Sequence, residues 1–181
     1  DPEPSQGNAY ATYAWASQLA EVEVDTETGQ VEVIRLASAT DAGKAINPKG
    51  VEGQIEGGAV QGLGFALMEN MIVERGTFVN SRLSTYLFPT AADVPRLDPL
   101  IVEVYDPTGP HGAKGVAEPA TIPTAPAIFN AIADAIGKRA RFKNTKKTTR
   151  IIKVCCFVAR LVMAPEGAWK RKWTIRHSSS V

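Results

Sequence analysis

Apolar and polar residues alternate along residues 18–25, where Ala20, Val22 and Val24 are separated by acidic side chains. A period of two is typical of a β-strand with one face in a core and the other in water. The turn sequence TETGQ follows, and a second alternating run comes after it. Because the glycine of such a turn can adopt a positive φ, the pattern predicts a β-hairpin over residues 18–39.

The rest of the first three quarters of the chain mixes strands with helices. A second hairpin is predicted at 71–80, with its turn near Arg75–Gly76, and a further strand at 100–106. One helix is predicted at roughly 54–70, and another follows Thr124, which is a plausible N-cap. The stripes expected to face the core are Val60, Leu63, Leu67 and Met68 in the first helix, and Ile128, Ala131, Ile132 and Ala135 in the second. This combination predicts an α+β fold.

The composition is that of a folded chain. Hydrophobic residues make up 44% of the 181 residues and charged residues 22%, which excludes global disorder and collagen. No apolar run approaches the ~18 residues that a membrane-spanning helix needs. The two cysteines, Cys155 and Cys156, are adjacent, so neither a disulfide framework nor a zinc site of the usual spacing is expected.

The charge of the chain is divided between two segments. Residues 1–137 carry 7 Lys and Arg against 18 Asp and Glu, whereas residues 138–181 carry 13 against one. Segments of such opposite character differ in origin or in task. We therefore assign residues 1–138 to a folded domain and residues 139–181 to a separate basic tail.

Glycines crowd residues 41–70, within and before the first predicted helix. A glycine inside a helix costs about 1 kcal/mol relative to alanine, so several of them require a reason. Their spacing fits neither a P-loop nor the dinucleotide fingerprint GxGxxG. Two interpretations stay open: close packing of the helix against another backbone, or close approach of a large ligand to the glycine backbone.

A long segment dense in glycine and proline, residues 106–126, joins the predicted strand to the second helix. Loops of this length in compact domains are often functional. Glu118 lies in it among small and apolar residues, and a carboxylate desolvated there could serve as a general base. The alternative is an ordinary solvated loop glutamate. His111 could be a switch or a ligand, although a single loop histidine is more often neither.

Four motifs in this chain occur together, in order, in one known family. They are DAGKAINP at 41–48, GQIEGGAVQGLGFAL at 53–67, STYLFPTAADVP at 84–95 and GAKGVAEPATIPTAPAIFNAI at 112–132. On these motifs, residues from about 9 to 138 resemble the C-terminal part of the molybdopterin-binding large subunit of the xanthine dehydrogenase and aldehyde oxidase family, the molybdenum hydroxylases. The resemblance implies that residues 1–138 are a partial molybdenum-cofactor-binding domain.

The resemblance also implies an activity, the oxidative hydroxylation of an aldehyde or of an N-heteroaromatic, purine-like carbon with a molybdenum-bound hydroxide. The glutamate of the family motif GxGEP acts as general base and falls on Glu118. The cofactor-binding positions carried over are Gln54, Gly53, Gly57, Gly115 and Val116, and no side chain is carried over as a metal ligand. This chain departs from the family at Ala117, where a glycine is usual, and a position that needed a positive φ would be strained by alanine.

The resemblance implies partners as well. A 2Fe-2S cluster and FAD are expected on other domains or subunits, together with a small-molecule substrate and without a nucleic acid or membrane partner. The earlier cofactor-binding loops of the subunit are not in this sequence, so the isolated chain is expected to be inactive. The expected location is the cytoplasm.

The resemblance does not extend into residues 139–181. One interpretation is a basic arm for nucleic acid or an anionic membrane, and a second is a non-native tail such as an out-of-frame extension. The third is an unusual but folded extension, since the run IIKVCCFVARLVM is apolar enough to pack. The abrupt charge reversal favours the second. The alternative for the whole chain is accordingly a non-catalytic remnant with a basic nucleic-acid-binding or interaction tail.

Overall fold

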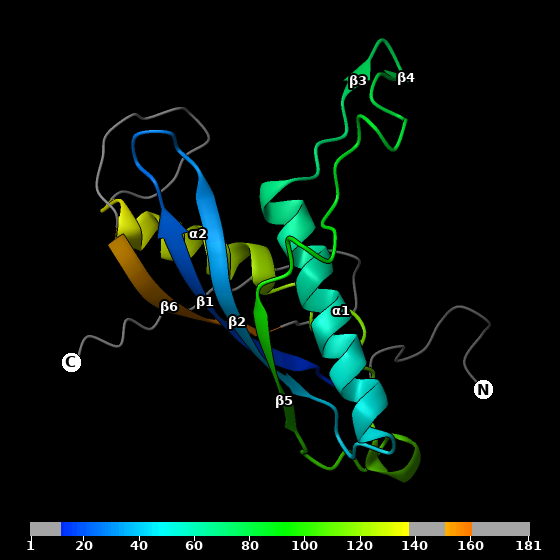
Figure 1. The fold of residues 1–181 in the computed structure, drawn as a ribbon. Coiled ribbons are helices and arrows are strands. Elements are labelled where there is room, and N and C mark those ends of the chain that lie inside the picture. The colour runs from blue at the N-terminus through cyan, green and yellow to red at the C-terminus, as the bar shows by residue number, and fades with distance from the viewer. Residues whose placement is uncertain (1–11, 138–150, 161–181) are drawn as a thin grey trace.

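The computed structural model describes residues 12–137 and the backbone of residues 151–160. Its centre is a four-stranded sheet in the order β5-β2-β1-β6, with two helices packed against one face (Figure 1). The strands are β1 (Trp15–Val24), β2 (Val31–Asp41), β5 (Arg96–Val102) and β6 (Ile151–Arg160), and the helices are α1 (Pro48–Leu67) and α2 (Thr124–Ala135). The α+β fold predicted from the sequence is confirmed.

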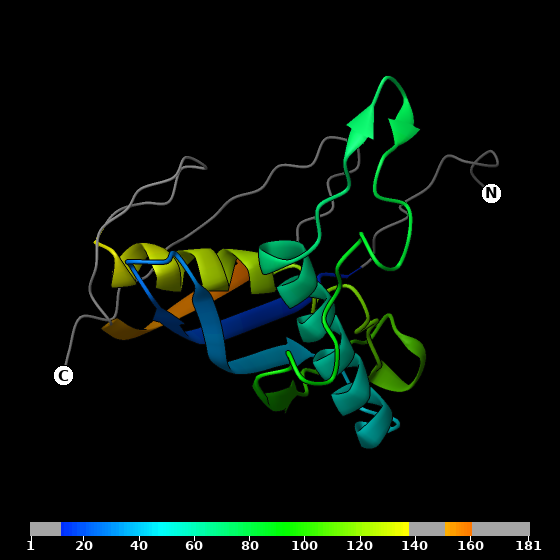
Figure 2. The same cartoon turned by 45° about the horizontal axis from the view of Figure 1, so that its top comes forward.

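The hairpin of β1 and β2 forms as predicted and supplies the floor of the core. The two strands pair antiparallel, with Ala20 opposite Leu36, and the register shifts once, between Glu21 and Val22. Every second residue of β1 from Ala16 to Val24 is buried. Alternation therefore places one face of the hairpin under the helices, as the turned view of Figure 2 shows.

The helices divide the sheet between them. Helix α2 packs on β1 and β6, and α1 packs on β2 and β5. Eleven buried residues form the common core: Ala20, Val22, Val24, Val33, Leu36, Ala59, Leu63, Ala127, Ile128, Ala131 and Ala135. Alanine dominates the helix side of this core, which lets both helices approach the sheet closely.

Strand β5 differs from its prediction at both ends, because it begins at Arg96 rather than at residue 100 and ends at Val102. It pairs parallel to β2 at the edge of the sheet and includes Pro99. Proline has no N–H for a ladder, and an edge strand tolerates it because one side of the strand needs no partner. The predicted strand started only after Pro99, but the observed strand continues through it.

Helix α1 begins six residues earlier than predicted. Asn47 caps it, since its side-chain oxygen accepts a hydrogen bond from the N–H of Gly50 at 3.2 Å, and Pro48 occupies the first turn. The predicted stripe is partly wrong, because Leu67 is exposed and the buried face carries glycines. The buried residues are Ile55, Gly58, Ala59, Gly62, Leu63 and Gly64.

Helix α2 has the predicted buried face but not the predicted cap. Its N-cap residue is Pro123, which makes no side-chain cap bond. The hydroxyl of Thr124 instead donates to the carbonyl of Ala120 at 3.3 Å. Thr124 is fully buried, so its hydroxyl is used to fasten the preceding loop.

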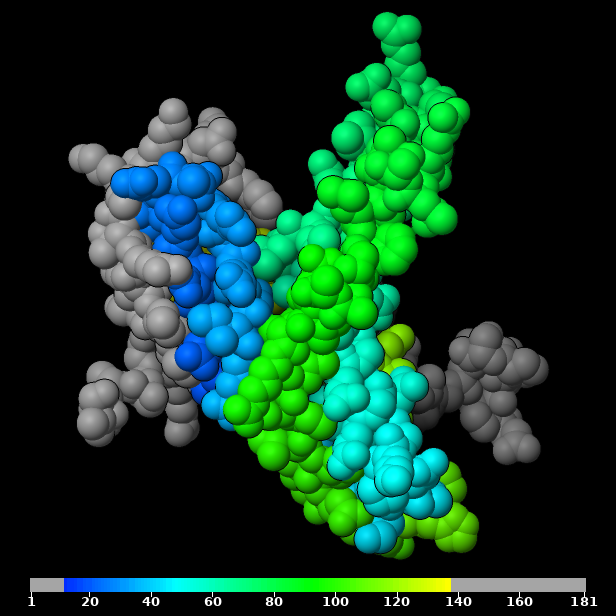
Figure 3. Space-filling view, viewed as in Figure 1, coloured from blue at the N-terminus to red at the C-terminus, as the bar shows by residue number. Residues whose placement is uncertain are grey.

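Residues 69–95, here called the arm, project away from the sheet (Figures 1 and 3). At its tip the predicted hairpin forms from β3 (Val73–Glu74) and β4 (Thr77–Phe78). The arm carries a series of exposed apolar side chains: Met71, Ile72, Val73, Phe78, Val79, Leu83, Leu87, Phe88 and Val94. Its base is joined by a 2.5 Å hydrogen bond from the Tyr86 hydroxyl to Glu69.

Part of the basic tail lies in the sheet. Strand β6, within the apolar run of the tail, pairs antiparallel with β1 over all ten of its residues, Ile151–Arg160. The other tail residues, 139–150 and 161–181, lie outside the described residues. Among the described residues, no helix combines the length and apolarity that crossing a bilayer would take.

Candidate functional site

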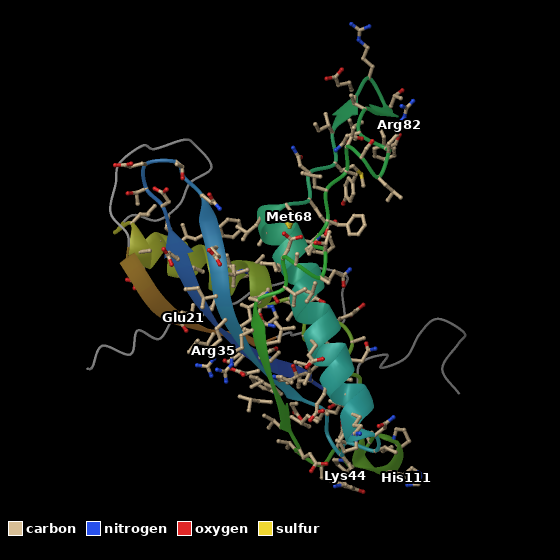
Figure 4. All side chains as sticks on the ribbon, in the orientation of Figure 1. Glu21, Arg35, Lys44, Met68, Arg82 and His111 are labelled. Atoms are coloured by element: carbon tan, nitrogen blue, oxygen red, sulfur yellow. The ribbon has the colours of Figure 1, made fainter. Side chains whose placement is uncertain are left out.

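The loop that carries Glu118, residues 112–123 and here called the Glu118 loop, is fastened at its start to the end of β2. Gly43 and Ala113 form an isolated β-bridge. The N–H of Lys44 donates to the carbonyl of Gly112 at 2.7 Å, and the N–H of Lys114 donates to the carbonyl of Ala42 at 2.9 Å. The motifs DAGK and GAKG, far apart in sequence, are therefore one structural unit, and Figure 4 shows Lys44 and His111 at the same end of the molecule.

A buried ion pair reinforces this connection. The Nζ atom of Lys114 lies 2.7 Å from Oδ2 of Asp41, and their side chains are only 9% and 5% exposed. The other carboxylate oxygen of Asp41 accepts a hydrogen bond from the N–H of Gly43 at 2.9 Å. A buried charge pair of this kind fixes geometry strongly, because either charge alone would be costly to bury.

The chain entering the Glu118 loop is ordered by Asp106. Its Oδ1 accepts hydrogen bonds from the N–H and the hydroxyl of Thr108, at 2.9 and 2.7 Å. Hydrogen bonds from the side chain of Thr12 and then from Thr108 lower the pKa of Asp106 to about 2, and the positive charge of Lys114 contributes least. Asp106 is thus ionised at neutral pH and holds the turn that precedes the loop.

The end of the Glu118 loop is fastened to β1, the strand that lies beside β2 in the sheet. Nε2 of Gln18, on β1, donates to the carbonyl of Ala120 at 2.6 Å and to the hydroxyl oxygen of Ser38 at 2.9 Å. Gln18 is 1% exposed. The carbonyl of Ala120 also accepts the Thr124 hydroxyl, so strand, loop and helix α2 meet at this one oxygen.

Helix α1 lies directly against the same segment, and two of its glycines make this possible. A Cβ on Gly58 would lie 2.8 Å from Cβ of Ala120, and one on Gly62 would lie 2.5 Å from Cβ of Thr124. Neither position has space for a side chain. Close packing therefore explains Gly58 and Gly62, which confirms one of the two interpretations left open for the glycine-rich segment.

Gly53, Gly57 and Gly115, predicted to bind the cofactor, are different. All three are exposed, and a Cβ on any of them would meet no described atom within 4 Å. Val116 beside Gly115 is half-buried. Nothing within the described chain requires these three residues to be glycine.

Gln54 and Glu118 are both exposed. Gln54 precedes Gly58 by one helical turn, and Gly58 contacts Ala120, two residues after Glu118. The structure thus brings their elements together, but in the part of the chain that it describes no hydrogen bond joins the two side chains. The carbonyl of Glu118 accepts the N–H groups of Thr121 and Ile122 at 3.0 and 3.3 Å, which makes residues 118–122 a tight turn.

Ala117 does not have the positive φ that would make alanine strained. Arg75 and His111 are the non-glycine residues with positive φ in the described part of the chain. The departure from the usual family glycine therefore costs no backbone strain here. His111 is an exposed residue of a short 3-10 helix, Pro110–Gly112, whose φ of 55° turns the chain toward the Glu118 loop.

Three residues of this site were not singled out from the sequence: Gln18, Asp41 and Lys114. Asp41 and Lys114 lie inside the motifs, but nothing in a linear sequence says that they pair. Gln18 did give a signal. It continues the buried phase of Ala20, Val22 and Val24, and a polar residue on that phase indicates a buried hydrogen bond.

Comparison with known proteins shows that this chain is similar to molybdopterin-binding and molybdenum-binding proteins. The family model described as a molybdopterin cofactor-binding domain matches residues 1–95. The "Xanthine dehydrogenase molybdenum-binding subunit" of Escherichia coli O157:H7 is 36% identical over 126 residues, covering 68% of this chain and 17% of that protein. The "Aldehyde oxidoreductase molybdenum-binding subunit PaoC" of Escherichia coli K12 is 36% identical over 135 residues, covering 73% and 18%.

Solved structures of two oxidoreductases also resemble the fold of this chain. The aldehyde oxidoreductase of Desulfovibrio gigas superposes with a TM-score of 0.64 at 38% identity, covering 72% of this chain and 14% of that one. Quinoline 2-oxidoreductase of Pseudomonas putida 86 superposes with a TM-score of 0.62 at 39% identity, covering 65% and 15%. The chain therefore spans less than a fifth of the length of these relatives.

Proposed function

The chain belongs to the molybdopterin cofactor-binding domain family, and on this premise we propose that it is the C-terminal part of the catalytic subunit of a molybdenum hydroxylase. The proposed reaction is the oxidative hydroxylation of an electrophilic carbon in an aldehyde or an N-heteroaromatic ring. The names of the similar proteins support both substrate classes, since they include an aldehyde oxidoreductase, a xanthine dehydrogenase subunit and a quinoline oxidoreductase. Because the chain spans at most 18% of the relatives compared above, the activity is proposed for the assembled subunit and not for the isolated chain.

The residues present fit a large polar cofactor. An exposed glycine in a helix costs about 1 kcal/mol, and among the described residues none packs against Gly53 or Gly57 to offset it. Close approach of a flat pterin to the backbone gives these glycines a reason. The exposed amide of Gln54, adjacent to Gly53, can both donate to and accept from a pterin without adding charge, and the backbone of Gly115 and Val116 adds contacts from the Glu118 loop.

When bound, the cofactor supplies a Lewis-acidic molybdenum ion that activates a hydroxide near neutral pH and takes up two electrons. We assign to Glu118 the role of general base. Its carboxylate would be the proton acceptor in that chemistry, a role that requires hydrogen-bond reach, about 2.6–3.2 Å, of the atom that gives up the proton. Gln54 would hold the pterin, and the fastened loop holds the backbone that carries the carboxylate.

The observation that carries this proposal is the position of Glu118. It lies on a tight turn that is fastened at both sides, two residues before Ala120, against which Gly58 of α1 packs, and its own side chain is exposed. An ordinary solvated loop glutamate would need no such support.

Iron-sulfur and flavin groups on other domains or subunits are the proposed acceptors of the electrons. The cytoplasm is the proposed location, and cell fractionation with immunodetection of the chain would test it.

The test is to assemble a complete large subunit carrying this sequence with its redox partners. We expect it to bind molybdenum and to oxidise benzaldehyde or hypoxanthine, with the product oxygen drawn from ¹⁸O-labelled water. The water oxygen is required because the reaction converts R–H and H₂O into R–OH, two protons and two electrons. A molybdenum-loaded subunit that oxidises neither probe, or that takes its oxygen from O₂, would contradict the proposal.

A further inference from the structure

Gln18 joins two segments that are 102 residues apart in sequence. Its Nε2 donates at 2.6 Å to the carbonyl of Ala120, and the same nitrogen donates to Ser38. The side chain is buried between the sheet and the Glu118 loop. Its Oε1 atom is also buried but has no hydrogen-bond partner among the described residues.

This half-satisfied amide is informative. An apolar side chain of the same length, such as methionine, would fill the same space without leaving a buried acceptor unpaired. What the amide adds is therefore its donor, directed at Ala120. The contact does more than fill space in the core, because it ties the Glu118 loop to strand β1 at Ala120.

Ala120 belongs to the tight turn that begins at Glu118. The Glu118 carbonyl accepts the N–H groups of Thr121 and Ile122, so hydrogen bonds link Glu118 to the residues that follow Ala120. A hydrogen bond to the carbonyl of Ala120 therefore also restrains the backbone of Glu118, two residues away. The Lys114–Asp41 ion pair fixes the other side, four residues before Glu118.

We infer that Gln18 is a positioning residue for Glu118: its amide, together with the Lys114–Asp41 pair, holds the turn that aims the carboxylate. This inference rests on the proposed function only for the role of Glu118. The anchoring itself concerns residues whose contacts are described above, and it can be measured in the 181-residue chain without cofactor.

The first arm of the experiment is hydrogen exchange on the full chain. Gln18→Met removes the donor and keeps the length of the side chain, so the amides of Thr121 and Ile122 should exchange about 5–10-fold faster, while those of Val22 and Leu36 stay unchanged. The matched control is Ser38→Ala, which removes the other partner of the same nitrogen and should leave the turn protected. Equal acceleration in turn and hairpin, or none in the turn, would overturn the anchoring.

The second arm uses the assembled enzyme. Gln18→Met should lower kcat about 10-fold, with KM and bound molybdenum unchanged, because misplacement of a base slows the chemical step. In a subunit that already carries Glu118→Gln, the same change should have no further effect, since the residue acts through the carboxylate. A merely structural role would lower both backgrounds equally and would overturn the inference.

Gln18→Asn serves as a second variant if Gln18→Met does not fold. It keeps the amide but shortens the side chain by one methylene, so it should lose the bond to Ala120 and give the same pattern in both arms. The two proposals fail separately. If Glu118→Gln itself does not reduce turnover, the proposed base is wrong, whereas the exchange result decides the anchoring independently.

Discussion

The ammonium of Lys114 lies 2.7 Å from the carboxylate of Asp41, and both groups are almost completely removed from water. This pair connects the residue that follows the Gly112–Ala113 corner to the last residue of β2. The pair therefore attaches the Glu118 loop to the sheet at the end of β2. The stability of the chain should therefore depend on this pair.

Replacing Lys114 by methionine should destabilise the chain strongly. The substitution leaves Asp41 buried without its cation, and breaking a buried pair in this way typically costs about 3–5 kcal/mol. The matched control is Lys44→Met, which breaks an exposed pair with Glu103 at 3.0 Å and should cost less than about 1 kcal/mol. Urea denaturation of both variants measures the difference, and equal losses would show that burial does not matter at Lys114.

Two neighbouring glycines of α1 should respond to alanine in opposite directions. Gly58→Ala would force a Cβ to 2.8 Å from Ala120 and should lower the free energy of unfolding by about 1–3 kcal/mol. Gly57→Ala meets open space and should raise it by about 0.5–1 kcal/mol, since alanine favours the helix. Thermal unfolding of the isolated chain compares them. Destabilisation by Gly57→Ala would mean that other residues of the chain pack against Gly57.

Asp106 should give the chain a specific sensitivity to acid. Its pKa is lowered from 3.8 to about 2 in the folded chain, chiefly by the Thr12 hydroxyl and then by Thr108. Because the folded pKa is the lower one, this stabilisation is complete above the unfolded value and disappears as the pH falls through about 2. The thermal midpoint of the wild type should fall more steeply between about pH 4 and pH 2 than that of Asp106→Asn. Parallel curves would contradict the assignment.

Gln54→Ala in the assembled subunit should weaken retention of the cofactor. Activity should then fall in proportion to lost molybdenum, because in the proposed site the amide binds the pterin and takes no part in proton transfer. Gln61→Ala, an exposed glutamine further along the same helix, is the control and should retain full metal content. Elemental analysis gives the answer, and equal molybdenum in both variants would remove Gln54 from the site.

The sequence predicted those elements whose periodicity is local. The alternation of β1 and β2 and the apolar stripe of α2 are such patterns, and both hairpins were placed correctly. The start of α1 was missed because its first turn contains Pro48 and Gly50, which have low helix propensity and are rescued by the cap at Asn47. The early start of β5 was missed because parallel pairing with β2 overrides the proline at 99.

In the candidate site, sequence motifs indicated the chemistry but not the contacts that support it. Glu118 and Gln54 were found through motifs, and their roles remain predictions. The contact of Gln18 with Ala120 spans 102 residues, and no local pattern encodes a partner at that distance. Gly58 and Gly57 look alike in sequence, and only the structure separates a packing glycine from an open one.

The most direct test of the central claim is turnover per bound molybdenum in an assembled subunit that carries Glu118→Gln. The amide is nearly isosteric with the carboxylate and leaves Gln54 and the loop anchors in place, so cofactor content should match the wild type. Turnover should fall by roughly 10²–10⁴-fold, the range typical of removing a general base. Near-normal turnover per molybdenum, with the cofactor bound, would show that Glu118 is not the base.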